Sequence, residues 1–127
     1  MQLLIDNCTA RYRIRGYTAN SVTVNDIELV RSFIITPDRL IADWAPRTIA
    51  DITTEQMRLV LELMPDLVLL GTGQSTQFPC ATVRAAVLGL GIGLEAMDTA
   101  SACRAYGVLT SEGRNIAAAI LMPDAAA

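Results

Sequence analysis

The segments DLVLLGTG (residues 66–73) and GIGLEAMDT (residues 91–99) lie within the stretch from Pro65 to Pro123 that decides the fold. Leu67–Leu70 is a short, wholly apolar run, which is typical of a strand covered on both faces. Because a helix-like run follows each segment, the stretch predicts a strand, helix, strand, helix, strand order with a glycine turn after the first strand. Strands separated by helices of this length pair in parallel through right-handed crossovers.

The two helices of this stretch have recognisable starts and ends. Phe78-Pro79 opens the first, with proline suited to its first turn, and the expected buried stripe is Val83, Ala86, Val87 and Leu90. Glycines at 89, 91 and 93 then end it, and Leu94–Met97 is predicted to be a second central strand. Asp98 or Thr99 caps a helix that carries Ala102, Tyr106 and Leu109 inward and ends at Gly113. The continuously apolar segment 116–122 predicts a third buried strand.

Another helix precedes this stretch. Thr53 and Gln56 have the spacing of a capping box, and Met57, Val60, Leu61 and Met64 follow on one apolar face until Pro65 ends the helix.

The first half of the chain reads as strands. Residues 21–24 and 27–36 predict two strands joined by a tight turn at Asn25-Asp26, because both residues tolerate left-handed backbone. Pro37-Asp38 closes the second strand, and residues 40–44 predict one more short strand, with Trp44 as a core or rim packing residue. The predicted fold is α/β: a single three-layer domain over residues 1–127, with a mixed central β-sheet, a parallel β-α-β-α-β core and an N-terminal β-hairpin. Residues 1–10 and 124–127 are expected to fray.

The composition excludes most catalytic machinery. All ten basic residues are arginine, and the chain has no histidine and no lysine. It therefore has no Ser-His-Asp triad, no histidine metal ligand and no lysine Schiff base or phosphate clamp. We assign no catalytic residue, no metal site and no cofactor.

The net charge of −3 argues against a general nucleic-acid binder. Arg11, Arg13 and Arg15 alternate with Tyr12 and Ile14, so an extended backbone places the three arginines on one face. This stripe indicates either an anionic partner or a solvated strand, and the acidic balance favours the second. We predict no nucleic-acid partner.

Three cysteines, Cys8, Cys80 and Cys103, are too far apart for a CxxC site and odd in number, which favours a reducing compartment. Cys80 in a first helical turn is either a reactive thiolate or a packing residue, whereas Cys103 resembles packing. Residues 1–5 are apolar but too short for a signal sequence, and no run approaches the ~20 apolar residues of a membrane span. The expected protein is cytoplasmic, without a membrane span.

The glycine turn after the first parallel strand is the best candidate for a site. Ligands of open sheets bind at the carboxyl ends of parallel strands, where Gly71 and Gly73 would let backbone N–H groups approach an anion. Thr72, Gln74, Ser75 and Thr76 would donate hydrogen bonds, the helix near Pro79 would favour negative charge, and Arg84 or Arg104 would close the pocket. The alternative is that the glycines only permit a tight turn, since a dinucleotide fingerprint requires glycine where Thr76 stands.

The glycine turn, Phe78-Pro79, the segment 91–99 and residues 102–106, 109 and 112–114 resemble a family of small single-domain proteins. Its animal members include the mitochondrial respiratory complex I assembly factor 3 and an adipogenesis-associated protein. The resemblance runs from about Ile14 to Leu121 and implies a three-layer fold with a mixed central sheet. It implies no catalytic residue set, and the mitochondrial member suggests a role in assembling a membrane complex.

Three functional hypotheses follow. The first is a non-catalytic binding or assembly protein with a protein partner. The second is a domain that binds a small anionic ligand, or is weakly enzymatic, at the turn Gly71-Thr72-Gly73. The third, nucleic-acid binding through the arginine stripe, is the least favoured. The sequence leaves the oligomeric state open, including a homo-oligomer.

Overall fold

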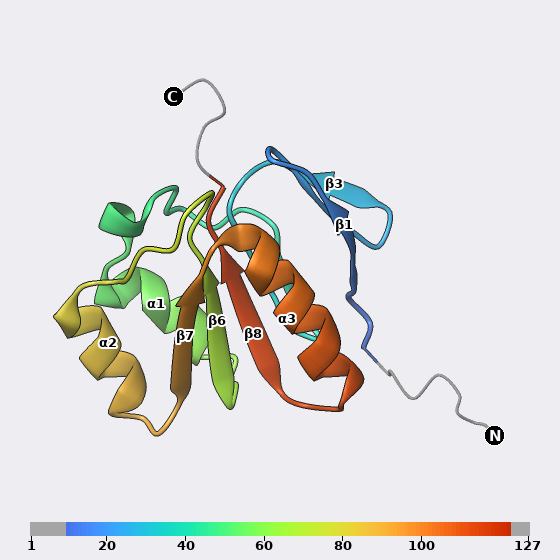
Figure 1. The fold of residues 1–127 in the computed structure, drawn as a ribbon. Helices are drawn as coiled ribbons and strands as arrows, with labels where there is room; N and C mark the ends of the chain where they lie inside the picture. The colour runs from blue at the N-terminus through green and yellow to red at the C-terminus, as the bar shows by residue number, and fades with distance from the viewer. Residues whose placement is uncertain (1–9, 123–127) are drawn as a thin grey trace.

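The computed structural model describes residues 10–122, which form two β-sheets and three α-helices (Figure 1). The larger sheet has the strand order β5-β4-β8-β6-β7. Its members are β4 (Phe33–Ile35), β5 (Leu40–Ile41), β6 (Leu67–Gly71), β7 (Gly93–Met97) and β8 (Ile116–Ile120). The smaller sheet, in the order β1-β2-β3, contains β1 (Ile14–Tyr17), β2 (Val22–Val24) and β3 (Ile27–Leu29).

The parallel core is confirmed. Strand β6 pairs in parallel with β7 on one side and with β8 on the other, whereas β4 pairs antiparallel with β8 and β5. All five residues of β8 are buried, because this strand lies in the middle of the sheet and both of its faces are covered. The sheet is therefore mixed, as predicted.

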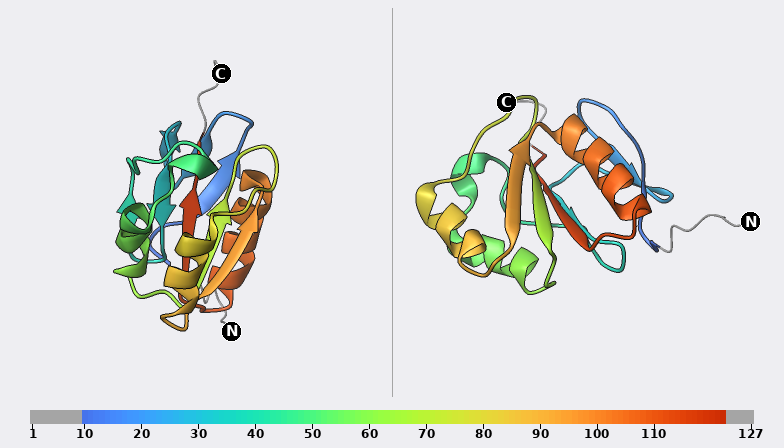
Figure 2. Two further views of the ribbon diagram at one scale, coloured as in Figure 1. Left: turned by 90° about the vertical axis from the view of Figure 1, so that its left-hand side faces the viewer. Right: turned by 60° about the horizontal axis from the view of Figure 1, so that its bottom comes forward.

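The larger sheet is the middle of three layers. Helices α1 (Thr54–Leu61) and α2 (Ala81–Leu88) cover one face, where Met57, Val60, Val83 and Val87 are buried in one core cluster. Helix α3 (Thr99–Ser111) covers the other face together with the smaller sheet. A view along the sheet shows α1 and α2 on one side and α3 on the opposite side (Figure 2).

One strand prediction was wrong, because residues 27–36 form two strands in different sheets rather than one continuous strand. The hairpin turn at Asn25, with φ of 53°, leads into β3 as expected. The chain then leaves the smaller sheet at residues 30–32 and enters the larger one as β4. Buried Ser32 fixes this crossing, since its Oγ accepts a hydrogen bond from Met122 N at 2.9 Å and its carbonyl accepts one from Trp44 N.

Two further strand predictions need correction. Strand β7 was expected to be central, but it is an edge strand whose residues are only half-buried or exposed. The expected strand over residues 40–44 is the two-residue β5, after which Trp44 is buried and donates from Nε1 to Gln56 O at 3.3 Å. The prediction that Trp44 packs in the core is confirmed.

The helix ends also differ from the predicted ones. Thr53 is the N-cap of α1 and accepts from Gln56 N, as predicted, but α1 ends at Leu61. Met64 adopts φ of 55° outside the helix and is 76% exposed, so its expected burial is wrong. Helix α2 begins at Ala81, two residues after Pro79, and Leu90 beyond its end is 65% exposed rather than buried.

The N-terminal alternation is confirmed in part. Arg11, Arg13 and Arg15 are exposed while Tyr12 and Ile14 are half-buried, but the strand itself starts only at Ile14. The predictions for residues 1–5, for Cys8 and for the tail 124–127 fall outside the described residues.

Candidate functional site

The candidate site lies where the chain connections of the parallel strands diverge. The loop after β6 leads to α2 on one face of the sheet, whereas the residues after the neighbouring β7 lead directly into α3 on the other face. Adjacent strands whose connections leave toward opposite faces open a crevice at their carboxyl ends, which is the preferred ligand position in open α/β sheets. The predicted glycine turn lies at this position, at the carboxyl end of β6.

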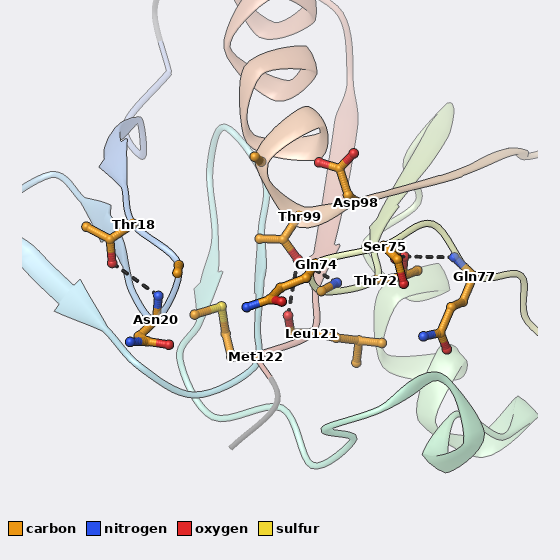
Figure 3. Close-up of a pocket in the computed structure, with 13 residues that line it drawn as sticks. Thr18, Asn20, Thr72, Gln74, Ser75, Gln77, Asp98, Thr99, Leu121 and Met122 are labelled. Atoms are coloured by element: carbon orange, nitrogen blue, oxygen red, sulfur yellow. Dashed lines mark hydrogen bonds between the residues drawn. The ribbon is translucent and has the colours of Figure 1, made fainter. Parts of the chain in front are cut away.

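A cavity of about 520 Å³ occupies this position (Figure 3). Four segments meet around it: the β1–β2 loop, the β6–α2 loop, the start of α3 and the residues after β8. Its lining residues are Thr18, Ala19, Asn20, Thr72, Gly73, Gln74, Ser75, Gln77, Asp98, Thr99, Ala100, Leu121 and Met122. The volume is within the range of about 300 to 1,000 Å³ that small-molecule sites occupy.

Thr99 links two sides of the cavity. Its Oγ1 accepts a hydrogen bond from Gly73 N at 2.9 Å and donates one to Leu121 O at 3.2 Å. Its own backbone N–H donates to Gly73 O at 2.8 Å. Gly73 has φ of 95°, a conformation that favours glycine, and this lets the loop turn toward the start of α3.

Thr72 organises the rest of the loop. Its buried Oγ1 donates to Ser75 O at 2.7 Å and accepts from Gln77 N at 3.0 Å. The backbone N–H of Thr72 donates to Met97 O. The loop after β6 therefore has a defined shape that its own hydrogen bonds maintain.

Four of the eight predicted site residues line the cavity: Thr72, Gly73, Gln74 and Ser75. Gly71 is buried beneath it, where a Cβ would lie 2.9 Å from Ile120 Cδ1 and 3.2 Å from Thr99 Cα. Thr76 is exposed and does not line the cavity.

The two predicted arginines lie elsewhere. Arg84 is an exposed residue of α2 outside the lining. Arg104 projects from α3 toward the smaller sheet, where it donates to Tyr17 Oη at 2.7 Å and to Ser101 Oγ at 3.2 Å. Neither arginine closes the cavity, and none of the described residues that line it carries a guanidinium group.

The helix that meets the cavity is α3 and not α2, which corrects the expected source of the helix dipole. Asp98 is its N-cap, and its carboxylate accepts from Ser101 N at 2.8 Å and from Ser101 Oγ at 3.0 Å. The backbone hydrogen bond from Ser101, followed by the one from its hydroxyl, lowers the pKa of Asp98 below its ordinary value, so the group stays ionised at neutral pH.

Sequence reasoning missed Thr18, Asn20 and Met122. They come from the smaller sheet and from the end of β8, and no local pattern connects them with the glycine turn. Only the arrangement of the two sheets brings them together.

The cysteines do not form a site here. Cys80 is the N-cap of α2 rather than part of its first turn, and it is exposed. Cys103 is buried in the core on the α3 face, and burial raises the pKa of its thiol to about 12, so the prediction that it packs is confirmed.

Within residues 10–122, no three Cys, Asp or Glu side chains gather as metal ligands would. None of the described helices has both the length and the apolar character to cross a bilayer.

Three comparisons relate the chain to known proteins. The rat (Rattus norvegicus) protein NADH dehydrogenase (ubiquinone) 1 alpha subcomplex assembly factor 3 is 30% identical over 112 residues, covering 87% of this chain and 60% of the relative. A Xanthomonas campestris protein solved by NMR has a TM-score of 0.81 and 41% identity, covering 96% of this chain and 92% of that chain. A crystal structure from Bordetella parapertussis has a TM-score of 0.84 and 32% identity, covering 91% and 98%.

The family described as "Protein of unknown function (DUF498/DUF598)" matches residues 14–121, which is the range over which the resemblance was expected. The chain spans about 60% of the length of its rat and bovine relatives. With most of its residues matched and with the same fold in the Xanthomonas and Bordetella proteins, the chain belongs to the DUF498/DUF598 family.

Proposed function

We propose that this protein is a non-catalytic binding protein that, like an assembly factor, holds a protein partner during construction of a larger complex. The observation that supports this most is its 30% identity over 112 residues to a protein named as an assembly factor of NADH dehydrogenase. The proposal concerns the shared domain, because the rat relative is longer than this chain. We also propose a cytoplasmic location, which cell fractionation with the tagged protein would test.

The partner would bind exposed apolar residues that lie on helices α1 and α2 and directly after them. Helices α1 and α2 are in contact on one face, and each leads into one of the neighbouring parallel strands β6 and β7. The connections that leave these helices therefore lie at the same end of the sheet. Leu59, Met64, Leu88 and Leu90, which we call the α1–α2 apolar group, are 43%, 76%, 55% and 65% exposed. Protein interfaces use such side chains.

The test compares a variant of this surface with a matched control. Leu88→Ser combined with Leu90→Ser removes two exposed side chains of the α1–α2 apolar group. Val108→Ser removes one of similar exposure, 58%, from α3 on the opposite face. We expect cross-linked partner recovered from the protein's own cells to fall several-fold for the double variant and to stay unchanged for the control. Equal recovery with all three proteins would contradict the role of this surface.

A second candidate function is the binding of a small ligand in the cavity at Thr72–Ser75. The position of the cavity where the strand connections diverge supports it. The anionic ligand expected from the sequence would have to bind without Arg84 and Arg104, since neither lines the cavity. Calorimetric titration with inorganic phosphate tests this form: saturable heat that Ser75→Ala abolishes would support it, and absence of heat would refute it.

A further inference from the structure

The charge of the cavity wall gives the first indication of what it binds. Among the thirteen lining residues, Asp98 is the one with an ionisable side chain, and it is negative. Both of its oxygens already accept hydrogen bonds from Ser101. An anion placed here would lose water without gaining a positive partner, which is costly.

Three backbone donors of the loop are not available to an anion. An anion cradle in a glycine turn depends on N–H groups that point outward and have no other acceptor. Here Gly73 N donates to Thr99 Oγ1, Gln77 N donates to Thr72 Oγ1, and Thr72 N donates to Met97 O. These three donors are used within the protein.

Of the three carboxamide side chains in the lining, that of Gln77 points away from Gln74 and Met122, whereas those of Asn20 and Gln74 lie toward Met122 (Figure 3). Asn20, in the β1–β2 loop, and Gln74, in the β6–α2 loop, both line the cavity. In the described part of the chain, neither side chain makes a hydrogen bond to another protein group. Gln74 extends toward Met122, and the Asn20 loop lies beyond Met122 on the opposite side (Figure 3). Each carboxamide offers both an NH₂ donor and a C=O acceptor.

We propose that the cavity binds a neutral amide group, which Asn20 and Gln74 recognise through paired donor and acceptor contacts above the apolar floor of Leu121 and Met122. A carboxamide ligand needs an acceptor for its N–H and a donor for its C=O, and each of the two side chains offers both. The inference rests on the second candidate function, a ligand site in this cavity, and changes its chemistry from anionic to neutral. The amide belongs either to a peptide segment of a protein partner or to a small molecule.

The experiment is an NMR titration of the full chain, labelled with ¹⁵N, with four probes at matched ionic strength. N-acetylglycine N-methylamide represents a peptide, acetamide a small amide, sodium phosphate an anion and ethylammonium chloride a cation. We expect saturable shifts of the Asn20 and Gln74 side-chain NH₂ signals with one or both amides. A stronger response to N-acetylglycine N-methylamide assigns the peptide source, and a stronger response to acetamide assigns the small-molecule source.

Variants complete the test. Asn20→Ala combined with Gln74→Ala should weaken amide binding about tenfold or more, because each contact contributes a hydrogen bond of ordinary strength. Thr76→Ala is the control and should leave binding unchanged, since Thr76 is an exposed residue of the same loop that does not line the cavity. Saturable binding of phosphate or ethylammonium alone would overturn the neutral-amide inference but would still support a ligand site in this cavity. No saturable shift with any of the four probes would overturn both.

Discussion

Replacement of Thr99 by valine tests the structural basis of the cavity. The Thr99 hydroxyl joins the loop after β6 to the end of β8, because it accepts from Gly73 N at 2.9 Å and donates to Leu121 O at 3.2 Å. Valine keeps the shape of the side chain and removes both hydrogen bonds. A part-buried N–H and a C=O then lose their partner, at a cost of roughly 1 to 1.5 kcal/mol each, so the free energy of unfolding should fall by about 2 to 3 kcal/mol.

Thermal unfolding followed by far-UV circular dichroism gives the readout. For a domain of this size, each kcal/mol corresponds to roughly 3 to 5 °C, so we expect Tm to fall by about 6 to 15 °C. Thr82→Val, at an exposed position of α2, is the control and should leave Tm nearly unchanged, because threonine and valine have similar helix propensities. Amide exchange at Gly73 should also become faster in Thr99→Val. A Tm equal to that of Thr82→Val, with unchanged exchange at Gly73, would refute the role of Thr99.

Three further predictions follow from neighbouring residues. Gly71→Ala should lower the urea midpoint, with a loss of about 1 to 3 kcal/mol, because the new Cβ would lie 3.2 Å from Thr99 Cα; an unchanged midpoint would show that α3 can move away. The pKa of Asp98 is lowered by folding, so its carboxylate stabilises the protein above its ordinary value of 3.8, and this contribution is lost as the pH falls through the lowered pKa. Asp98→Asn should therefore show a shallower loss of stability in acid urea titrations than the wild type, and parallel curves would contradict this. Iodoacetamide at pH 8 should modify exposed Cys80 and leave Cys103 unmodified until urea is added, because burial raises the pKa of the Cys103 thiol to about 12. Peptide mass spectrometry gives the readout, and modification of Cys103 without urea would contradict this prediction.

Local patterns in the sequence predict the elements of the fold well. Thr53 and Asp98 cap their helices through the side-chain contacts that their sequence contexts predict. The apolar runs 67–70 and 116–122 contain the strands β6 and β8, although β8 ends at Ile120. A strand covered on both faces needs apolar residues at every position.

The errors arise where tertiary structure overrides a local pattern. Met64 continues the helical period of α1, but the chain has already left the helix and turned toward β6. Apolar Leu94 and Ala96 are typical of a central strand, but their strand β7 lies at the edge of the sheet. The central strand is β8, which lies between β4 and β6. The order of strands in a sheet depends on crossover direction, which a single apolar run does not reveal.

The candidate site was likewise predicted only where a local sequence pattern marks it. The sequence located its loop, Thr72–Ser75, from a rule about strand ends, and the cavity is there. It did not locate Asn20 and Met122, because these residues reach the cavity only through the packing of the smaller sheet and the end of β8.

The complete capping box at Thr48 and Asp51, in the short 3-10 helix Ile49–Asp51, was also missed, since no apolar period follows it.

We propose above all that the protein binds a protein partner in the manner of an assembly factor. Native mass spectrometry of the tagged chain, purified gently from its own cells after the membranes are solubilised, tests this most directly. We predict a complex whose mass equals the chain plus identified subunits of one larger assembly, in fixed stoichiometry. A spectrum that contains only the bare chain, or only copies of it, would contradict the claim.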